Sequence, residues 1–545
     1  MPSITFSEKD LFKLVGKTIP EAELTTILES AKAEIESREN GKITLKFNDT
    51  NLPYLWSIEG VARFIRLFKN LQSSPAKLKL EEKSYEIKTE PSVATVRPII
   101  GGFVAEGSKI TEELLEQLIQ LQEKLADSYG KNREKISIGL YPASKIKFPL
   151  TYKAVDPSFK FTPLEFSHDM TLASILKEHP KGMKYAKILE NKKQYPILVD
   201  ATNSVLSFPP IINSNNLGKL TIGDNVIFCD VTGHELKDVN LALVICAYAL
   251  SERGFKIYPT KVNNHVLPDL RFKKVMFDKK LVKEVLGLDL GDKEIKELLH
   301  KFGYEVEGNV VEIPPYRQDI MHNVDIVEDI GIAYGYDKLI PIPLTSYTVG
   351  STFPIINFVD KFRTIVAGCG FQEVYSAILS NKEALYEKMN LQESSTVELL
   401  DFISNNYSVI RSSLLPMLMD VLQKSKHNTY PQMLFEQGVI SVLLNNEAVD
   451  KEHCALISVH NNASFTEIKS VMGAIARNLG IELEYNIAEN DSYIKGRCAS
   501  ISYRKKQFGV MGELSPAVLG NWKLELPAAA AELDLSALFE ELSKR

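Results

Sequence analysis

Apolar residues recur at two spacings along the chain, and each spacing predicts a different element. Leucines and an isoleucine stand three or four positions apart in TEELLEQLIQLQEKLADSYG, residues 111 to 130, which predicts an amphipathic helix. The short apolar runs in KQYPILVD, SVLSFPPIIN and NVIFCDVTG predict strands between residues 193 and 233. The apolar segment DVNLALVICAYALSERG predicts a buried helix that ends at Gly254.

The pattern changes between residues 268 and 340. Two short amphipathic helices are predicted near 279–286 and 292–302. Gly308-Asn309, between the apolar runs of YEVEGNVVEI, predicts a hairpin turn. A further helix, closing at AYGYD, follows the hairpin. Helices around a small hairpin suggest a winged-helix-like module.

Beyond about residue 345, strands alternate with helices to the last residue. Two capping boxes are predicted, Ser7 with Asp10 and Ser464 with Glu467. A chain of 545 residues suggests three or four domains. The expected fold class is α+β, with several domains whose boundaries we place at 1–88, 89–266, 267–344 and 345–545.

Composition and charge exclude several classes of protein. The chain is 44% hydrophobic and 25% charged, as in globular proteins, and its net charge is -6 with no basic run. If this chain binds a nucleic acid, another protein chain would therefore supply much of the positive charge that holds it. The five cysteines form no CxxC pair, which favours a reducing cytoplasm over a disulfide framework or a zinc site. The N-terminus has no apolar signal core, and the longest apolar run, Leu241 to Leu250, is too short for a bilayer.

The segment PPYRQDIMHNVDIVEDIGIAYGYD, residues 314 to 337, crowds four acidic residues together. Like charges at helical spacings of three and four share a face and repel by a few tenths of a kcal/mol per pair. The face is either solvated or holds a cation, and magnesium takes such oxygen ligands. Both alternatives stay open on residue chemistry for the four acids, Asp319, Asp325, Glu328 and Asp329.

With the two residues that follow it, this segment closely resembles the B5 module of the β subunit of phenylalanyl-tRNA synthetase. The resemblance assigns all four acids to Mg²⁺, as a structural or subunit-linking ion. NDTNLPYLWSIEGVARFIR, at 48 to 66, resembles the N-terminal signature of the same family, with Leu52 and Tyr54 as departures.

Two further segments resemble the B3/B4 module of this family: YPILVDATNSVLSFPPIINS, at 195 to 214, and FCDVTGHELKDV, at 228 to 239. That module hydrolyses tyrosine wrongly attached to the phenylalanine tRNA. In the archaeal and eukaryotic branch, its pocket residues map onto Leu198, Ser207, Asp230 and Thr232. One departure is YPASKI, at 141 to 146, where Tyr141 and Ser144 replace a histidine and an acid of the eukaryotic branch.

Residues 414 to 440 and 508 to 535 resemble the catalytic-like domain of the same subunit, which has the antiparallel sheet of class II synthetases. A working site needs an arginine near LFEQG to clamp ATP phosphate, and none stands there, since Arg411 lies well upstream. The resemblance therefore implies a domain without an active site that packs against the α subunit, where ATP is used.

The domains expected in order are an N-terminal α/β module, the B3/B4 editing domain, a winged-helix-like B5 domain and the class II-like domain. The resemblance implies a cytoplasmic α2β2 phenylalanine–tRNA ligase that acts on tRNA(Phe), with no contact to a membrane. The short length of this chain, 545 residues, points to the archaeal type of the family. The rival hypotheses are a scaffold without hydrolytic activity and a freestanding editing enzyme.

Overall fold

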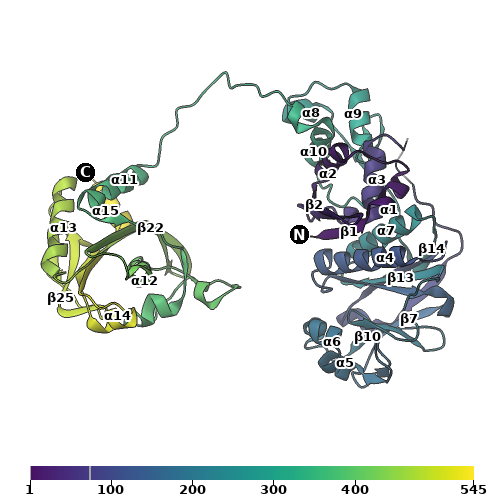
Figure 1. The fold of residues 1–545 in the computed structure, drawn as a ribbon, viewed down its shortest axis with the longest axis horizontal. Helices are drawn as coiled ribbons and strands as arrows, with labels where there is room; N and C mark the ends of the chain where they lie inside the picture. Colours follow the sequence, from purple (N-terminus) through teal and green to yellow (C-terminus); the bar gives the residue numbers. More distant parts are fainter. Residues whose placement is uncertain (1, 73–74, 76, 545) are drawn as a thin grey trace. The chain divides into compact units, whose positions relative to one another are not determined.

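The chain folds as two units, Met1–Ile342 and Pro343–Arg545 (Figure 1). The structure is a computed structural model that describes residues 2–72, 75 and 77–544. It mixes helices and sheets in both units, which confirms the expected α+β class. None of the helices among the described residues is long and apolar enough to cross a membrane.

The first unit begins with a three-stranded antiparallel sheet in the order β1-β3-β2. Its elements are β1 (Ser3–Ser7), α1 (Glu8–Val15), α2 (Glu21–Ser30), β2 (Ala33–Glu39), β3 (Lys42–Phe47) and α3 (Ile58–Phe68). The Ser7 hydroxyl caps α1 by accepting from the backbone N–H of Asp10, as predicted. The reciprocal half of that capping box does not form, because the Asp10 carboxylate binds Arg253 instead.

A ten-stranded sheet follows, in the order β12-β11-β10-β7-β4-β14-β5-β13-β6, with β15 paired to β14. The helices of this region are α4 (Glu112–Lys124), α5 (Leu172–Glu178), α6 (Pro180–Tyr185) and α7 (Leu236–Glu252). The buried helix α7 packs on β5 and β13. The strands are β4 (Tyr85–Thr89), β5 (Ile99–Glu106), β6 (Ile136–Pro142), β7 (Leu150–Val155), β10 (Tyr195–Val199), β11 (Val205–Phe208), β12 (Ile212–Asn213), β13 (Val226–Gly233), β14 (Lys256–Val262) and β15 (His265–Leu267).

The last part of this unit contains the hairpin and helices predicted between residues 268 and 340. Its sheet has the order β16-β18-β17, and the β17–β18 turn carries Gly308 at φ +60°. Both predicted short helices form, and the acidic helix is α10. The elements are β16 (Lys273–Met276), α8 (Lys280–Leu286), α9 (Asp292–His300), β17 (Glu305–Glu307), β18 (Val310–Ile313) and α10 (Asn323–Tyr334).

One hydrophobic core runs through the whole first unit, from Ile4 to Ala333. The three domains predicted within these residues therefore share a single core, and their boundaries stay predictions. The boundary at 88 falls inside β4, and the boundary at 266 falls inside β15.

The second unit is built on a seven-stranded sheet in the order β19-β22-β23-β27-β26-β25-β24. All its pairs are antiparallel except β19 with β22. The strands are β19 (Gln372–Glu373), β22 (Gln432–Leu444), β23 (Glu447–Val459), β24 (Glu484–Ile487), β25 (Tyr493–Tyr503), β26 (Lys506–Leu514) and β27 (Ala528–Asp534).

Successive residues of these strands point to opposite faces, so the sheet supplies two separate cores. In β22, Phe435 joins one core and Leu434 joins the other. The first core is covered by α11 (Pro354–Gly368), α13 (Phe465–Leu479) and α15 (Leu535–Leu542). The second is covered by α12 (Leu415–Ser425) and α14 (Pro516–Asn521).

A buried charge network holds α1, α3 and the end of α7 together. The Arg253 guanidinium donates to both Asp10 carboxylate oxygens at 2.7 and 2.8 Å, and to Glu59 at 2.7 Å. Asp10 and Glu59 are 5% and 2% exposed. Beside this network, the Arg63 guanidinium lies 4.5 Å from the Tyr316 ring centre, so α3 also meets the segment before α10.

We expect Arg253→Met to lower the free energy of unfolding of the first unit by about 3–5 kcal/mol, because two carboxylates stay buried without their cation. The chain has two tryptophans, Trp56 and Trp522, one in each unit. Urea unfolding followed by Trp56 fluorescence in a Trp522→Phe background measures the first unit by itself.

The matched control is Arg271→Met, which removes an arginine whose side chain is 88% exposed from its ion pair with Asp269. This change is expected to cost under about 1 kcal/mol. Equal losses for the two variants would show that the buried network contributes no special stability.

Candidate functional site

A cavity of about 450 Å³ opens where α4 faces the edge of the large sheet. Its wall combines α4, β6, the β11–β12 connection and Asp230 of β13. Most of the wall is apolar, with Leu115 from α4 and Phe208 and Ile212 from the sheet. Charged side chains at the cavity include Arg133, Glu165 and Lys181. The volume suits an amino-acid side chain with its backbone.

Two of the four predicted pocket residues line this cavity, and two lie behind its wall. Ser207 and Asp230 are lining residues, whereas Leu198 and Thr232 are not. Leu198 is fully buried and pairs with Ser207 across the β10–β11 ladder. Thr232 is also fully buried, two positions beyond Asp230 on the same face of β13. Leu198 and Thr232 can therefore act on a ligand only through Ser207, Asp230 or other neighbours.

Asp230 and Ser207 carry the unusual electrostatics of the site. Asp230 is 2% exposed, and neither its Oδ1 nor the Ser207 hydroxyl has a hydrogen-bond partner among the described residues. Burial raises the pKa of Asp230 to about 7, while the nearby Tyr141 hydroxyl and the charge of Arg97 act to lower it. An unpaired buried polar group is costly, so a group that binds here gains hydrogen bonds that the protein leaves unmade.

Arg97 holds Thr232 behind the cavity wall, and no signal in the sequence indicated this role. Its guanidinium is 1% exposed and donates to the Thr232 hydroxyl at 2.9 Å, the Thr232 carbonyl at 2.8 Å and the Glu134 carbonyl at 3.1 Å. No carboxylate in the part of the chain that the structure describes forms an ion pair with it. Burial lowers the pKa of Arg97 to about 10. The Thr232 hydroxyl also meets Ser137 at 2.8 Å, so this position is fixed from two sides.

Arg133 is a second residue that no sequence signal indicated. It donates through Nη1 to the carbonyls of Pro210 and Ile211, at 3.1 and 3.0 Å. The Pro209-Pro210 peptide bond is cis, and both prolines line the cavity. The two prolines offer no backbone N–H, so the loop is held by this arginine together with the Ile211 N–H, which donates to the Phe208 carbonyl at 2.8 Å.

The four acids of the B5-like segment do not point to one ion. Arg317 is 5% exposed and donates to both oxygens of Asp319, and to Asp329 at 2.8 Å. The Tyr304 hydroxyl also donates to Asp329. Burial raises the pKa of Asp329, and Arg317 opposes that shift.

The remaining two acids have other partners. Asp325 caps the start of α10 by accepting from the backbone N–H groups of Met321 and His322, both at 2.7 Å. Glu328 pairs with Lys32 at 3.1 Å. Among the described residues, no group of three or more His, Cys, Asp or Glu side chains could hold a metal ion. This arrangement does not fit a magnesium ion held by all four acids.

In the second unit, Arg411 reaches the LFEQG segment, which has no arginine of its own. Arg411 is 1% exposed and binds Glu436 of LFEQG through Nη1 at 2.6 Å. It also donates through Nε to the Val439 carbonyl at 2.9 Å, and a Cβ at Gly438 would lie 2.4 Å from its Nη2. An arginine near LFEQG is thus present in space although it is absent in sequence, and the fold uses it in a buried ion pair.

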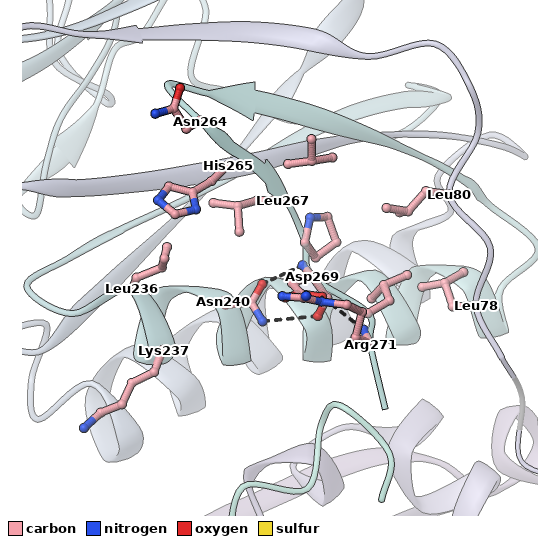
Figure 2. Close-up of a pocket in the computed structure, with 13 residues that line it drawn as sticks. Leu78, Leu80, Leu236, Lys237, Asn240, Asn264, His265, Leu267, Asp269 and Arg271 are labelled. Atoms are coloured by element: carbon pink, nitrogen blue, oxygen red, sulfur yellow. Dashed lines mark hydrogen bonds and ion pairs between the residues drawn. The ribbon is translucent and has the colours of Figure 1, made fainter. Parts of the chain in front are cut away.

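A larger cavity of the first unit, about 880 Å³, lies beside the β14–β15 hairpin and the start of α7 (Figure 2). Its central polar groups have partners: Asn240 and the backbone of Asp269 exchange two hydrogen bonds, at 3.2 and 2.7 Å. The Asp269 carboxylate pairs with Arg271. None of the predicted site residues lines this cavity.

Comparison with known proteins identifies the family. Residues 341–535 match the family model described as phenylalanyl tRNA synthetase beta chain CLM domain, and residues 275–336 match the tRNA synthetase B5 domain. The phenylalanine–tRNA ligase beta subunit of Pyrococcus abyssi is 38% identical over 555 residues, covering 99% of this chain and all of the relative. That of Archaeoglobus fulgidus is 38% identical over 556 residues, covering 99% of each. This chain belongs to the phenylalanine–tRNA ligase β-subunit family.

A solved structure supports the same assignment for the fold. The crystal structure of an N-terminal fragment of the phenylalanyl-tRNA synthetase β subunit from Pyrococcus horikoshii matches with a TM-score of 0.59 and 38% identity. It covers 62% of this chain and all of the fragment. The resemblance inferred from motifs is therefore confirmed, and a role in a phenylalanine–tRNA ligase follows from it.

The raised pKa of Asp230 gives this β subunit a defined stability–pH dependence. The fold favours the protonated form of an aspartate whose folded-state pKa lies above its usual 3.8. The contribution of Asp230 to the free energy of unfolding is therefore largest below pH 4 and is lost as the pH rises through about 7. We expect Asp230→Asn to be more stable than the wild type at pH 8, by up to about 4 kcal/mol. The difference should vanish near pH 4, and thermal unfolding at the two pH values measures it.

The control for this pH experiment is Asp238→Asn. Asp238 is equally buried, at 2% exposed, but it pairs with Lys135 at 3.0 Å and accepts from Tyr129 at 2.7 Å. Loss of that ion pair should destabilise the chain at pH 8. A loss of stability for Asp230→Asn as well would contradict the assignment of a costly buried charge to Asp230.

Proposed function

We propose that this chain hydrolyses tyrosine wrongly attached to tRNA(Phe), at the cavity lined by Ser207 and Asp230. The observation that carries this proposal is the pair of buried polar groups without a partner, Asp230 Oδ1 and the Ser207 hydroxyl, in a cavity of amino-acid size whose wall is partly apolar. The reaction adds water to the ester carbonyl and breaks the bond to the tRNA ribose, which releases tyrosine and free tRNA.

The physical need for such a site lies in the small difference between the two amino acids. A pocket built for phenylalanine excludes one added hydroxyl only weakly, because a hydrophobic site gains little by rejecting it. A second cavity with polar groups that require a hydroxyl can reject phenylalanine far more strongly, since phenylalanine leaves them unpaired. Ser207 and Asp230 offer such groups.

Neighbours of these two residues would hold the site rigid. Arg97 and Ser137 fix Thr232 behind the wall, and Arg133 fixes the Pro209-Pro210 loop in it. Leu198 pairs with Ser207 between β10 and β11, next to a change of register after Leu198. We assign Arg97, Thr232 and Leu198 to positioning, and assign contact with the bound amino acid to the lining residues, which include Ser137 and Arg133.

The second unit would have a structural role in an α2β2 assembly with the α subunit, which would adenylate phenylalanine with ATP. The burial of Arg411 against Glu436 supports this, because an arginine committed to that pair is not free to clamp a phosphate. The four-residue magnesium site stays a prediction of the family resemblance, and the contacts of the four acids do not support it. The rival function is a scaffold subunit without hydrolytic activity.

The decisive measurement is deacylation of Tyr-tRNA(Phe) and Phe-tRNA(Phe) by the α–β complex. The wild type should remove tyrosine and spare phenylalanine. We expect Asp230→Ala and Thr232→Ala to slow tyrosine removal by about tenfold or more, since each removes a buried polar contact. Asp169→Ala, an exposed aspartate outside the cavity, is the control. Stable Tyr-tRNA(Phe) in the presence of the wild type would favour the scaffold.

The proposed lack of an adenylation site has its own test. The purified chain without the α subunit should show no phenylalanine-dependent exchange of pyrophosphate into ATP, because Arg411 is held by Glu436 and Val439. The α–β complex, assayed under the same conditions, serves as the positive control. Measurable exchange by the chain alone would place an active site in the second unit.

A further inference from the structure

Tyr141, a departure from the family motif, is one of the polar residues that line the cavity. It lies near the end of β6, and its ring is 1% exposed and stacks on Phe228 with ring centres 5.7 Å apart. Its hydroxyl lies 3.5 Å from the Asn213 side-chain oxygen. Both Tyr141 and Asn213 line the cavity.

The Tyr141 hydroxyl and the Asp230 carboxylate converge on space that a glycine leaves open. Gly139 stands directly opposite Asp230 in the β6–β13 ladder. A Cβ at Gly139 would lie 2.1 Å from the Tyr141 hydroxyl and 2.3 Å from Asp230 Oδ1. Any side chain at this position would therefore separate the two groups.

Asp230 Oδ1 and the Ser207 hydroxyl have no hydrogen-bond partner among the described residues, although both lie close enough to the Tyr141 hydroxyl to shift its pKa. Burial and the neighbouring Asp230 raise the pKa of Tyr141 well above its usual value, so its hydroxyl keeps its proton. The cavity therefore presents an acceptor at Asp230 and hydroxyls at Ser207 and Tyr141, each of which can donate or accept.

This inventory matches a phenol better than an ammonium group. A phenol donates one hydrogen bond and accepts another, so it can satisfy a carboxylate and a hydroxyl together. An ammonium donates three bonds and accepts none, which would leave the Ser207 hydroxyl without an acceptor on the ligand, whereas the Tyr141 hydroxyl already donates to Asn213 Oδ1.

We propose that Tyr141 is a specificity-determining residue that contacts the hydroxyl of the bound tyrosine, with Asp230 and Ser207 beside it. The inference deepens the proposed editing function and rests on it. It also gives a role to the departure at YPASKI, because the tyrosine that replaces a histidine there supplies a hydroxyl to the cavity.

Tyr141→Phe tests this assignment, because it keeps the ring on Phe228 and removes only the hydroxyl. The probes are the non-hydrolysable amides 3′-(L-tyrosylamino)-3′-deoxyadenosine and its phenylalanyl counterpart. Binding is measured by calorimetry on the α–β complex, with the synthetic site saturated by a phenylalanyl-adenylate analogue. We expect the wild type to prefer the tyrosyl probe and Tyr141→Phe to lose about tenfold of that preference. Affinity for the phenylalanyl probe should change less than twofold.

Tyr129→Phe is the matched control, because its hydroxyl donates to Asp238 at 2.7 Å and does not line the cavity. This variant should keep the wild-type preference. Three results would overturn the assignment: no preference in the wild type, an unchanged preference in Tyr141→Phe, or an equal loss for both probes, which indicates packing alone. If the wild-type complex fails to deacylate Tyr-tRNA(Phe), the editing proposal falls, whereas the ratio of probe affinities still decides the role of Tyr141.

Discussion

The ion pairs of Arg253 with Asp10 and Glu59 impose the constraint on which the first unit depends. Two carboxylates from separate helices are buried around one guanidinium at the end of α7. Buried charges are tolerated only where each has a partner in good geometry, so α1, α3 and α7 have one arrangement that satisfies all three. Because α7 packs on β5 and β13, this arrangement also fixes the strand that carries Asp230.

The cavity and the network differ in how they treat buried charge. In the network every carboxylate meets an arginine, which is what structural burial requires. In the cavity, Asp230 Oδ1 and the Ser207 hydroxyl are left without partners, and Arg97 is held by hydroxyl and carbonyl oxygens of Thr232 and Glu134. Unmade hydrogen bonds of this kind cost stability, and they cluster where a ligand can complete them.

The acidic helix shows how tertiary contacts change an interpretation made from spacing. The spacing of its acids predicts one shared helix face. In the structure the acids have separate partners: Arg317, Lys32 and the backbone N–H groups at the N-terminus of α10. The arginine stands within the same motif, but nothing in its position there shows that its side chain turns inward. Arg411 behaves in the same way in the second unit, since it meets Glu436 across 25 residues.

Local patterns in the sequence were enough for the short helices and hairpin of the B5-like segment and for the capping serines Ser7 and Ser464. These depend on periodicity and turn chemistry within a few residues. The motifs also identified the family and predicted Ser207 and Asp230 as pocket residues, and both line the cavity. Only the tertiary structure brought Arg97 to Thr232, 135 residues away, and moved Leu198 and Thr232 behind the wall. The physical reason is that a sequence specifies which faces are apolar, whereas the packing of those faces decides which buried polar groups meet.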